Sequence, residues 1–171
     1  MTTRPDQLLQ DVADAILGDV DPGDRAEGER LVRSIVHGWG GDSDDPLWGD
    51  IVRIARGDLL DRLAKAGDRS TLDTLRDIAL EQRVEALSSR SLALAQPVAR
   101  GETPAADAQP DASEIAGEVD ELLEAAKTLA EDSELRRRLT RELADAALDV
   151  RFVLDGGEGA TSIRLARSLE D

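Results

Sequence analysis

The sequence lacks cysteine and tyrosine, and it holds a single histidine, His37. The absence of cysteine excludes disulfides, thiolate nucleophiles and cysteine-ligated zinc or iron–sulfur sites. A lone histidine excludes His-based metal motifs, and general acid–base catalysis would fall to carboxylates or lysines. We therefore predict that the chain is not an enzyme, with no catalytic residue, no metal and no cofactor.

Aromatic residues are almost absent: the sequence has Trp39, Trp48 and Phe152 and no other aromatic ring besides the histidine. The apolar residues, 40% of the chain, are therefore mainly alanine, leucine, valine and isoleucine. Strands favour aromatic and β-branched residues, whereas leucine and alanine suit closely packed helices. This composition predicts an all-α protein.

The chain also lacks a long apolar run. No stretch approaches the 18 or more apolar residues of a membrane span, and the start, MTTRPDQLLQDVADAIL, has acids where a signal peptide would be apolar. We expect a soluble, cytoplasmic protein with no membrane contact. The excess of arginine over lysine, with much alanine, glycine and aspartate, is typical of a bacterial genome of high GC content.

Positive charge is in short supply. The 37 acidic and 21 basic residues give a formal net charge of −16. Direct binding to nucleic acid or to an anionic membrane is disfavoured, because both need a basic face. A basic protein partner is compatible with this charge, although the charge could serve solubility alone.

The most regular feature is the stretch from Ser113 to Val150. Its first apolar stripe follows steps of four and three residues, the spacing of one helix face, and a second stripe begins at Leu135. Ser133 or Asp132 can cap the second helix. The pattern predicts an antiparallel helical hairpin, with one long kinked helix as the alternative. We predict that the first stripe contacts a partner chain through Ile115, Val119, Leu122 and Leu129.

The rest of the chain predicts three parts. Residues 1–96 form a four-helix unit, 97–112 a flexible linker, and 113–171 the hairpin with a short last helix. The linker prediction comes from PVARGETPAADAQPDA, which holds three of the six prolines and too little apolar surface to order itself. Ser70 and Ser162 are expected as helix caps. The side chains expected to face inward include Ile54, Leu60, Ile163 and Leu169.

Both tryptophans lie in a loop predicted for residues 37–50, which holds four glycines, 38, 40, 41 and 49, together with Pro46. One interpretation makes Trp39 and Trp48 partner-binding anchors, since tryptophan is enriched at interface hot spots, or the walls of a ligand pocket. The other interpretation is that the rings fill the gap between helices in a core that has few rings.

A dense basic cluster occurs at Arg136, Arg137 and Arg138, with Arg141 one turn later. Arginine forks onto carboxylates and phosphates, so this cluster could dock an acidic partner. The alternative is pairing within the helix, for example between Glu134 and Arg138.

These observations lead to one functional hypothesis and two alternatives. We expect a non-enzymatic acidic helical adaptor, accessory subunit or assembly factor that contacts another protein chain or a second copy of itself. The first alternative is a small ligand-binding helical sensor or enzyme with a pocket near Trp39 and Trp48. The second is a nucleic-acid mimic that inhibits a basic partner.

Overall fold

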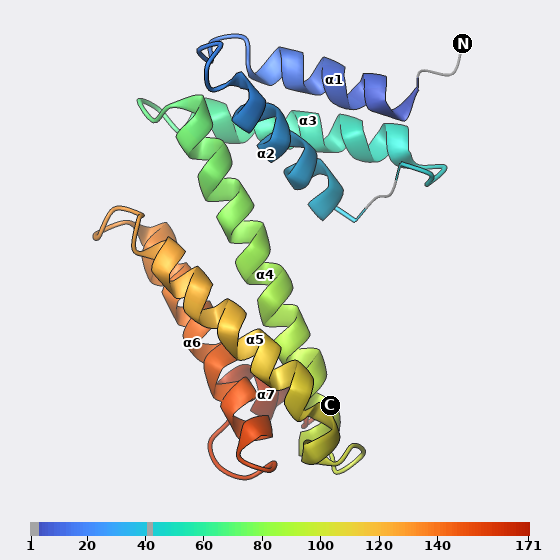
Figure 1. The fold of residues 1–171 in the computed structure, drawn as a ribbon, viewed down its shortest axis with the longest axis vertical. Coiled ribbons are helices and arrows are strands. Elements are labelled where there is room, and N and C mark those ends of the chain that lie inside the picture. Colours follow the sequence, from blue (N-terminus) through green and yellow to red (C-terminus); the bar gives the residue numbers. More distant parts are fainter. Residues whose placement is uncertain (1–3, 41–42) are drawn as a thin grey trace. The chain divides into compact units, whose positions relative to one another are not determined.

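The chain is described by a computed structural model that covers residues 4–40 and 43–171. These residues form helices and turns with no strand, which confirms the all-α class. The parts of our predictions that fall on residues 1–3, and on Gly41 and Asp42 of the tryptophan loop, lie outside the described residues. Figure 1 shows the elements, which are α1 (Pro5–Ile16), α2 (Arg25–Gly38), α3 (Trp48–Lys65), α4 (Thr71–Ala99), α5 (Ala105–Ala126), α6 (Glu134–Leu154) and α7 (Ile163–Ser168).

The chain divides into two compact units at residues 82 and 83. This boundary lies inside α4, so the two units share one continuous helix. Unit 1 holds α1, α2, α3 and the first part of α4. Unit 2 holds the rest of α4 with α5, α6 and α7.

Unit 1 has a core made of one face from each of its helices. Pro5 opens α1, where a first-turn proline leaves no unpaired N–H, and the buried residues of α1 then follow helical spacing. The rest of the core comes from α2, α3 and the start of α4. Its members are Leu9, Val12, Ala13, Ile16, Leu17, Val32, Ile35, Val36, Trp48, Val52, Ala55, Leu59, Leu75 and Ile78.

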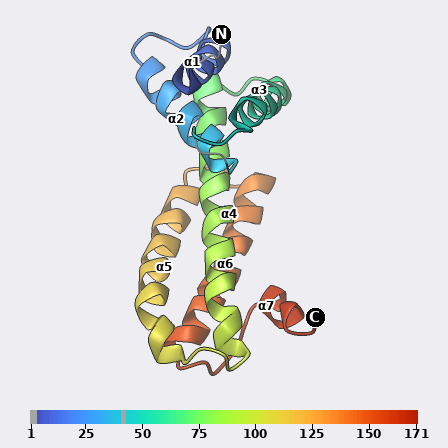
Figure 2. The same ribbon diagram turned by 90° about the vertical axis from the view of Figure 1, so that its right-hand side faces the viewer.

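Unit 2 is built on α5 and α6, which lie side by side (Figure 1). In Figure 2 the part of α4 that belongs to unit 2 runs along α5 and α6, and α7, to the right, is the last helix of the chain. Leucine, valine and alanine at helical spacing supply the buried faces. These are Val84, Leu87, Ala95, Ala108, Ala112, Ile115, Val119, Leu122, Ala126, Leu139, Leu143, Ala146, Val150, Val153 and Leu165.

The stretch predicted as a flexible linker, residues 97–112, is mostly helical. Helix α4 continues through Pro97 to Ala99, and α5 begins at Ala105 and contains Pro110. Only the turn between them is irregular. The physical reason is that alanine, the best helix former, also packs closely: Ala108 and Ala112 are buried. Small residues thus order this stretch although it lacks large apolar side chains.

The predicted serine caps are confirmed. The Ser133 hydroxyl accepts a hydrogen bond from the Arg136 N–H at 3.1 Å, and Ser162 accepts one from Leu165 at 3.0 Å. The Ser70 hydroxyl accepts from the Asp73 N–H at 3.1 Å. Each cap satisfies one of the free N–H groups at a helix start.

Four side chains that we expected to face inward are exposed. The exposed fractions are 60% for Ile54, 40% for Leu60, 72% for Ile163 and 38% for Leu169. Helix α3 buries only one face, and apolar residues also occur outside that face.

In the described part of the chain, no helix is long and apolar enough to cross a membrane.

Candidate interaction surface

The apolar stripe predicted to contact a partner lies inside unit 2. Ile115, Val119, Leu122 and Leu129 are all buried, with Leu122 only 1% exposed. Helix α6 lies directly beside α5 and buries a matching stripe of its own. The structure therefore places these four side chains in the interior of the unit and not at its surface. Leu129 lies in the turn after α5 and not on the helix itself.

The two tryptophans belong to the core of unit 1. Trp48 is the first residue of α3 and is buried, and its ring stacks on His37 with 5.1 Å between the ring centroids. Trp39, half-buried, packs against the same core. The Trp48 Nε1–H finds no hydrogen-bond partner among the described residues. This placement matches the interpretation of rings that fill the core.

The arginines at the start of α6 lie at its surface and in contact with the turn before it. The Arg136 guanidinium is half-buried and donates to the Leu129 carbonyl at 3.3 Å, within the turn that joins α5 to α6. Arg137 and Arg141 are exposed. Arg137 and Arg141 thus face solvent on α6, whereas Arg136 hydrogen-bonds the preceding turn. Docking of an acidic partner on this cluster stays a prediction.

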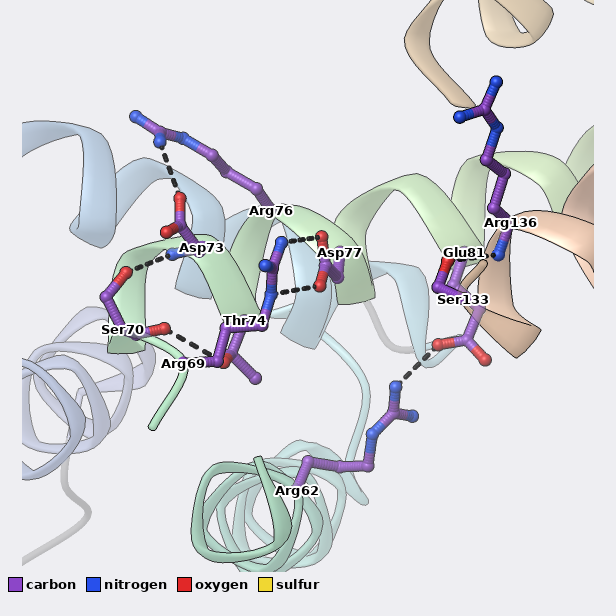
Figure 3. A network of polar contacts seen from close by, with 10 residues as sticks. All are labelled: Arg62, Arg69, Ser70, Asp73, Thr74, Arg76, Asp77, Glu81, Ser133 and Arg136. Carbon is purple, nitrogen blue, oxygen red and sulfur yellow. Dashed lines mark hydrogen bonds and ion pairs between the residues drawn. The ribbon is translucent and has the colours of Figure 1, made fainter. Parts of the chain in front are cut away.

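A network of arginines and carboxylates surrounds the start of α4 (Figure 3). Arg69 forms a two-pronged ion pair with Asp77, at 2.7 and 2.9 Å, and Arg62 of α3 reaches Glu81 at 2.7 Å. These pairs tie α3 and the turn after it to α4. Glu81 is buried, so the arginine compensates a carboxylate that has little contact with water.

Arg76 of α4 completes this network. It forks onto Glu27 of α2 at 2.8 and 2.9 Å and also contacts Asp73 at 3.1 Å. The hydrogen bond from Arg76 lowers the pKa of Glu27, and the hydrogen bond with Ser70 lowers the pKa of Asp73. Both carboxylates are therefore held in their charged form.

A hollow of about 530 Å³ lies beside this network. Its walls carry the acids of the turn between α1 and α2, and Arg69 and Arg76. Both of these arginines already bind carboxylates. Neither is therefore free to bind an anion in the hollow. Among the residues the structure describes, no group of three or more His, Cys, Asp or Glu side chains is arranged to hold a metal ion.

A second polar cluster lies inside unit 2, and sequence reasoning missed it. Asp149 is fully buried, and its carboxylate accepts two hydrogen bonds from Ser162, one from the N–H and one from the hydroxyl, both at 2.8 Å. Arg164 lies 3.7 Å from the same carboxylate and donates to Ser88, including its carbonyl at 3.0 Å. This cluster fastens α7 to α6 and α4. The sequence signal for this cluster was Asp149, an aspartate on the apolar face of α6.

The feature best suited to binding is a groove of about 270 Å³ between α1 and α3, also missed at the sequence level. Its lining is apolar at the floor and charged at the rim: Leu8, Asp11, Val12, Gly49, Val52, Arg53 and Arg56. Arg53 pairs with Asp50 at 3.0 Å. Arg56 is exposed and makes no hydrogen bond or ion pair within the described ranges. In the sequence, the signal for this groove was the spacing of Arg53 and Arg56 close to Gly49.

The chain was compared with known proteins by sequence and by fold. It matches no known family, no curated protein and no solved structure.

Proposed function

We propose that the chain is a non-enzymatic helical adaptor that acts through protein–protein contacts. The observation that carries this proposal is the exposed apolar surface of α3. Leu47, just before the helix, is 61% exposed, Ile54 is 60% exposed and Leu60 is 40% exposed. These three large apolar side chains, on α3 and just before it, offer surface that a partner protein can bury.

The proposed contact thus moves from α5 to α3. The stripe of α5 is satisfied within unit 2, whereas the side chains of α3 retain surface that another protein could bury. Complete burial of a leucine or isoleucine side chain contributes about 1.5–3 kcal/mol. Two such anchors contribute about 3–6 kcal/mol, which is comparable to the lower end of the entropic cost of association, about 4 kcal/mol. A stable contact therefore needs further burial around them.

The two alternatives receive less support. A ligand pocket near Trp39 and Trp48 needs accessible rings, and Trp48 is buried and stacked. A nucleic-acid mimic needs free carboxylates in a regular array, and several carboxylates of unit 1, among them Glu27 and Asp77, are bonded to arginines.

Position-specific photocrosslinking in the native host tests the adaptor proposal. A photoreactive amino acid replaces Ile54 in one variant and Gly117 in the control. Gly117 is exposed on α5 and has open space for a side chain. We expect one discrete crosslinked protein from position 54 and none from position 117. Equal or diffuse crosslinking from both positions would contradict the proposal.

A further inference from the structure

We infer that the groove between α1 and α3 binds a short amphipathic helix of a partner protein, with a carboxylate of that helix on Arg56. This inference rests on the proposed adaptor function and adds the chemistry of the partner. It follows from the shape of the groove, the open space at Gly49 and the unpaired charge at its rim.

The groove has room for apolar side chains of a docked helix. Leu8 and Val12 of α1 and Val52 of α3 supply the apolar part of its lining, and its volume of about 270 Å³ holds a few side chains. The lining residues of α3 run from Gly49 to Arg56, which is about 10 Å at 1.5 Å per residue, or about two turns of a docked helix.

Gly49 allows a partner to approach the backbone of α3 closely. It lies in the first turn of the helix, and a Cβ placed there would meet, beyond its own helix turn, no atom of the described residues within 4 Å. The missing side chain keeps that end of the groove open. An apolar side chain of the partner can therefore reach the floor beside Val52.

The charges at the rim select the partner. On the α3 side, Arg53 is paired with Asp50, whereas Arg56 has no partner in the structure described. On the α1 side, Asp11 accepts a hydrogen bond from Gln7 at 2.9 Å. The net charge of the whole chain, −16, repels a strongly acidic partner. The complementary helix therefore has an apolar face and one carboxylate, which reaches Arg56.

Fluorescence anisotropy with a designed peptide tests this inference on the full chain. The probe is a fluorescein-labelled helical peptide of about 14 residues with a leucine face and one glutamate, compared with versions that carry glutamine or lysine there. We expect the glutamate peptide to bind roughly fivefold more tightly than the lysine peptide, as one exposed ion pair allows. Arg56→Glu should reverse this order.

A steric variant supplies the second arm. Gly49→Trp should fill the groove and abolish peptide binding. Gly57→Trp is the matched control, because Gly57 is also exposed on α3 with open space around it but does not line the groove. Helical circular dichroism of both variants should equal that of the parent chain, which shows that the loss is local.

Three results would overturn the inference: equal affinity for the three peptides, no effect of Gly49→Trp, or no binding at all. Self-association of the parent chain in light scattering that Gly49→Trp abolishes would also overturn it, because a second copy would then occupy the groove. Ile54 lies outside the groove lining. Crosslinking from position 54 without peptide binding would therefore refute the groove and leave the adaptor proposal standing, whereas failure of both would refute both.

Discussion

Replacement of Asp149 by alanine should detach α7 from unit 2. The Asp149 carboxylate is completely buried and accepts both the backbone N–H and the hydroxyl of Ser162 at 2.8 Å. The same hydroxyl caps α7 at the Leu165 N–H. Alanine at position 149 removes the shared acceptor and leaves a buried N–H without a partner.

The size of the effect follows from these contacts. Hydrogen bonds to a charged group contribute about 1.5–3 kcal/mol each, so loss of two predicts about 3–6 kcal/mol. Release of α7 sets a limit to this cost, because the helix can detach instead of remaining in place with unpaired groups. That release exposes Leu165, now fully buried, at about 1.5–3 kcal/mol. We expect a net loss in the free energy of unfolding of about 3 kcal/mol.

Urea denaturation followed by circular dichroism measures this loss, and limited trypsin digestion locates it. Cleavage after Arg164 and Arg167 should accelerate in Asp149→Ala. Asp155→Ala is the control: Asp155 is exposed and reaches Arg151 only at 3.7 Å, so it should cost less than about 0.5 kcal/mol. A loss below about 1 kcal/mol in Asp149→Ala, with unchanged cleavage, would refute the role of this carboxylate.

Three further predictions concern pH and the two cores. The hydrogen bond from Arg76 lowers the pKa of Glu27 below its ordinary value of 4.5. The contribution of Glu27 to stability is therefore complete above about pH 4.5 and is lost as the pH falls through the lowered pKa. Glu27→Gln should reduce the acid sensitivity of the urea midpoint measured at pH 3–7, and an unchanged profile would count against this. Trp48→Phe removes a buried N–H that has no partner among the described residues. In thermal denaturation it should lose far less free energy of unfolding than Trp48→Ala, for which a loss of about 3–5 kcal/mol is expected. Equal losses in the two variants would indicate a hydrogen-bond partner of the indole. Leu143→Ala should cost about 2–5 kcal/mol because Leu143 is fully buried, whereas Ile163→Ala, at a 72% exposed position, should leave the urea midpoint unchanged; a comparable loss in both would contradict the burial pattern.

Local signals in the sequence predicted the helices well. Helical periodicity and serine caps depend on a few neighbouring residues, so Ser70, Ser133 and Ser162 could be assigned from the sequence. The stripe predicted from Ile115 to Leu129 is one helix face as far as Ala126, where α5 ends, and Leu129 lies in the turn that follows. The sequence could not say what covers that face, since a stripe that binds a partner and a stripe buried internally have the same spacing.

Composition was a poorer guide than periodicity. Prolines and small residues at 97–112 suggested disorder, but Pro97 lies near the end of α4 and Ala112 is fully buried in α5. The candidate groove was harder still to predict. The groove depends on which faces of α1 and α3 remain uncovered after packing. Ile54 and Leu60 were assigned to the interior because they are apolar, but apolar character does not show which side of a helix has a neighbour.

The ion pairs between the helices of unit 1 make its stability depend on the salt concentration. Its second, third and fourth helices are joined by ion pairs such as Arg76–Glu27, Arg69–Asp77 and Arg62–Glu81, whose arginines are all partly exposed. Mobile ions weaken such pairs, with a screening length of about 8 Å at physiological ionic strength. The α5–α6 seam of unit 2 is apolar, and kosmotropic salts such as sulfate strengthen burial of this kind. Concentrated sulfate should therefore strengthen the apolar cores of both units while it weakens the ion pairs that join the helices of unit 1.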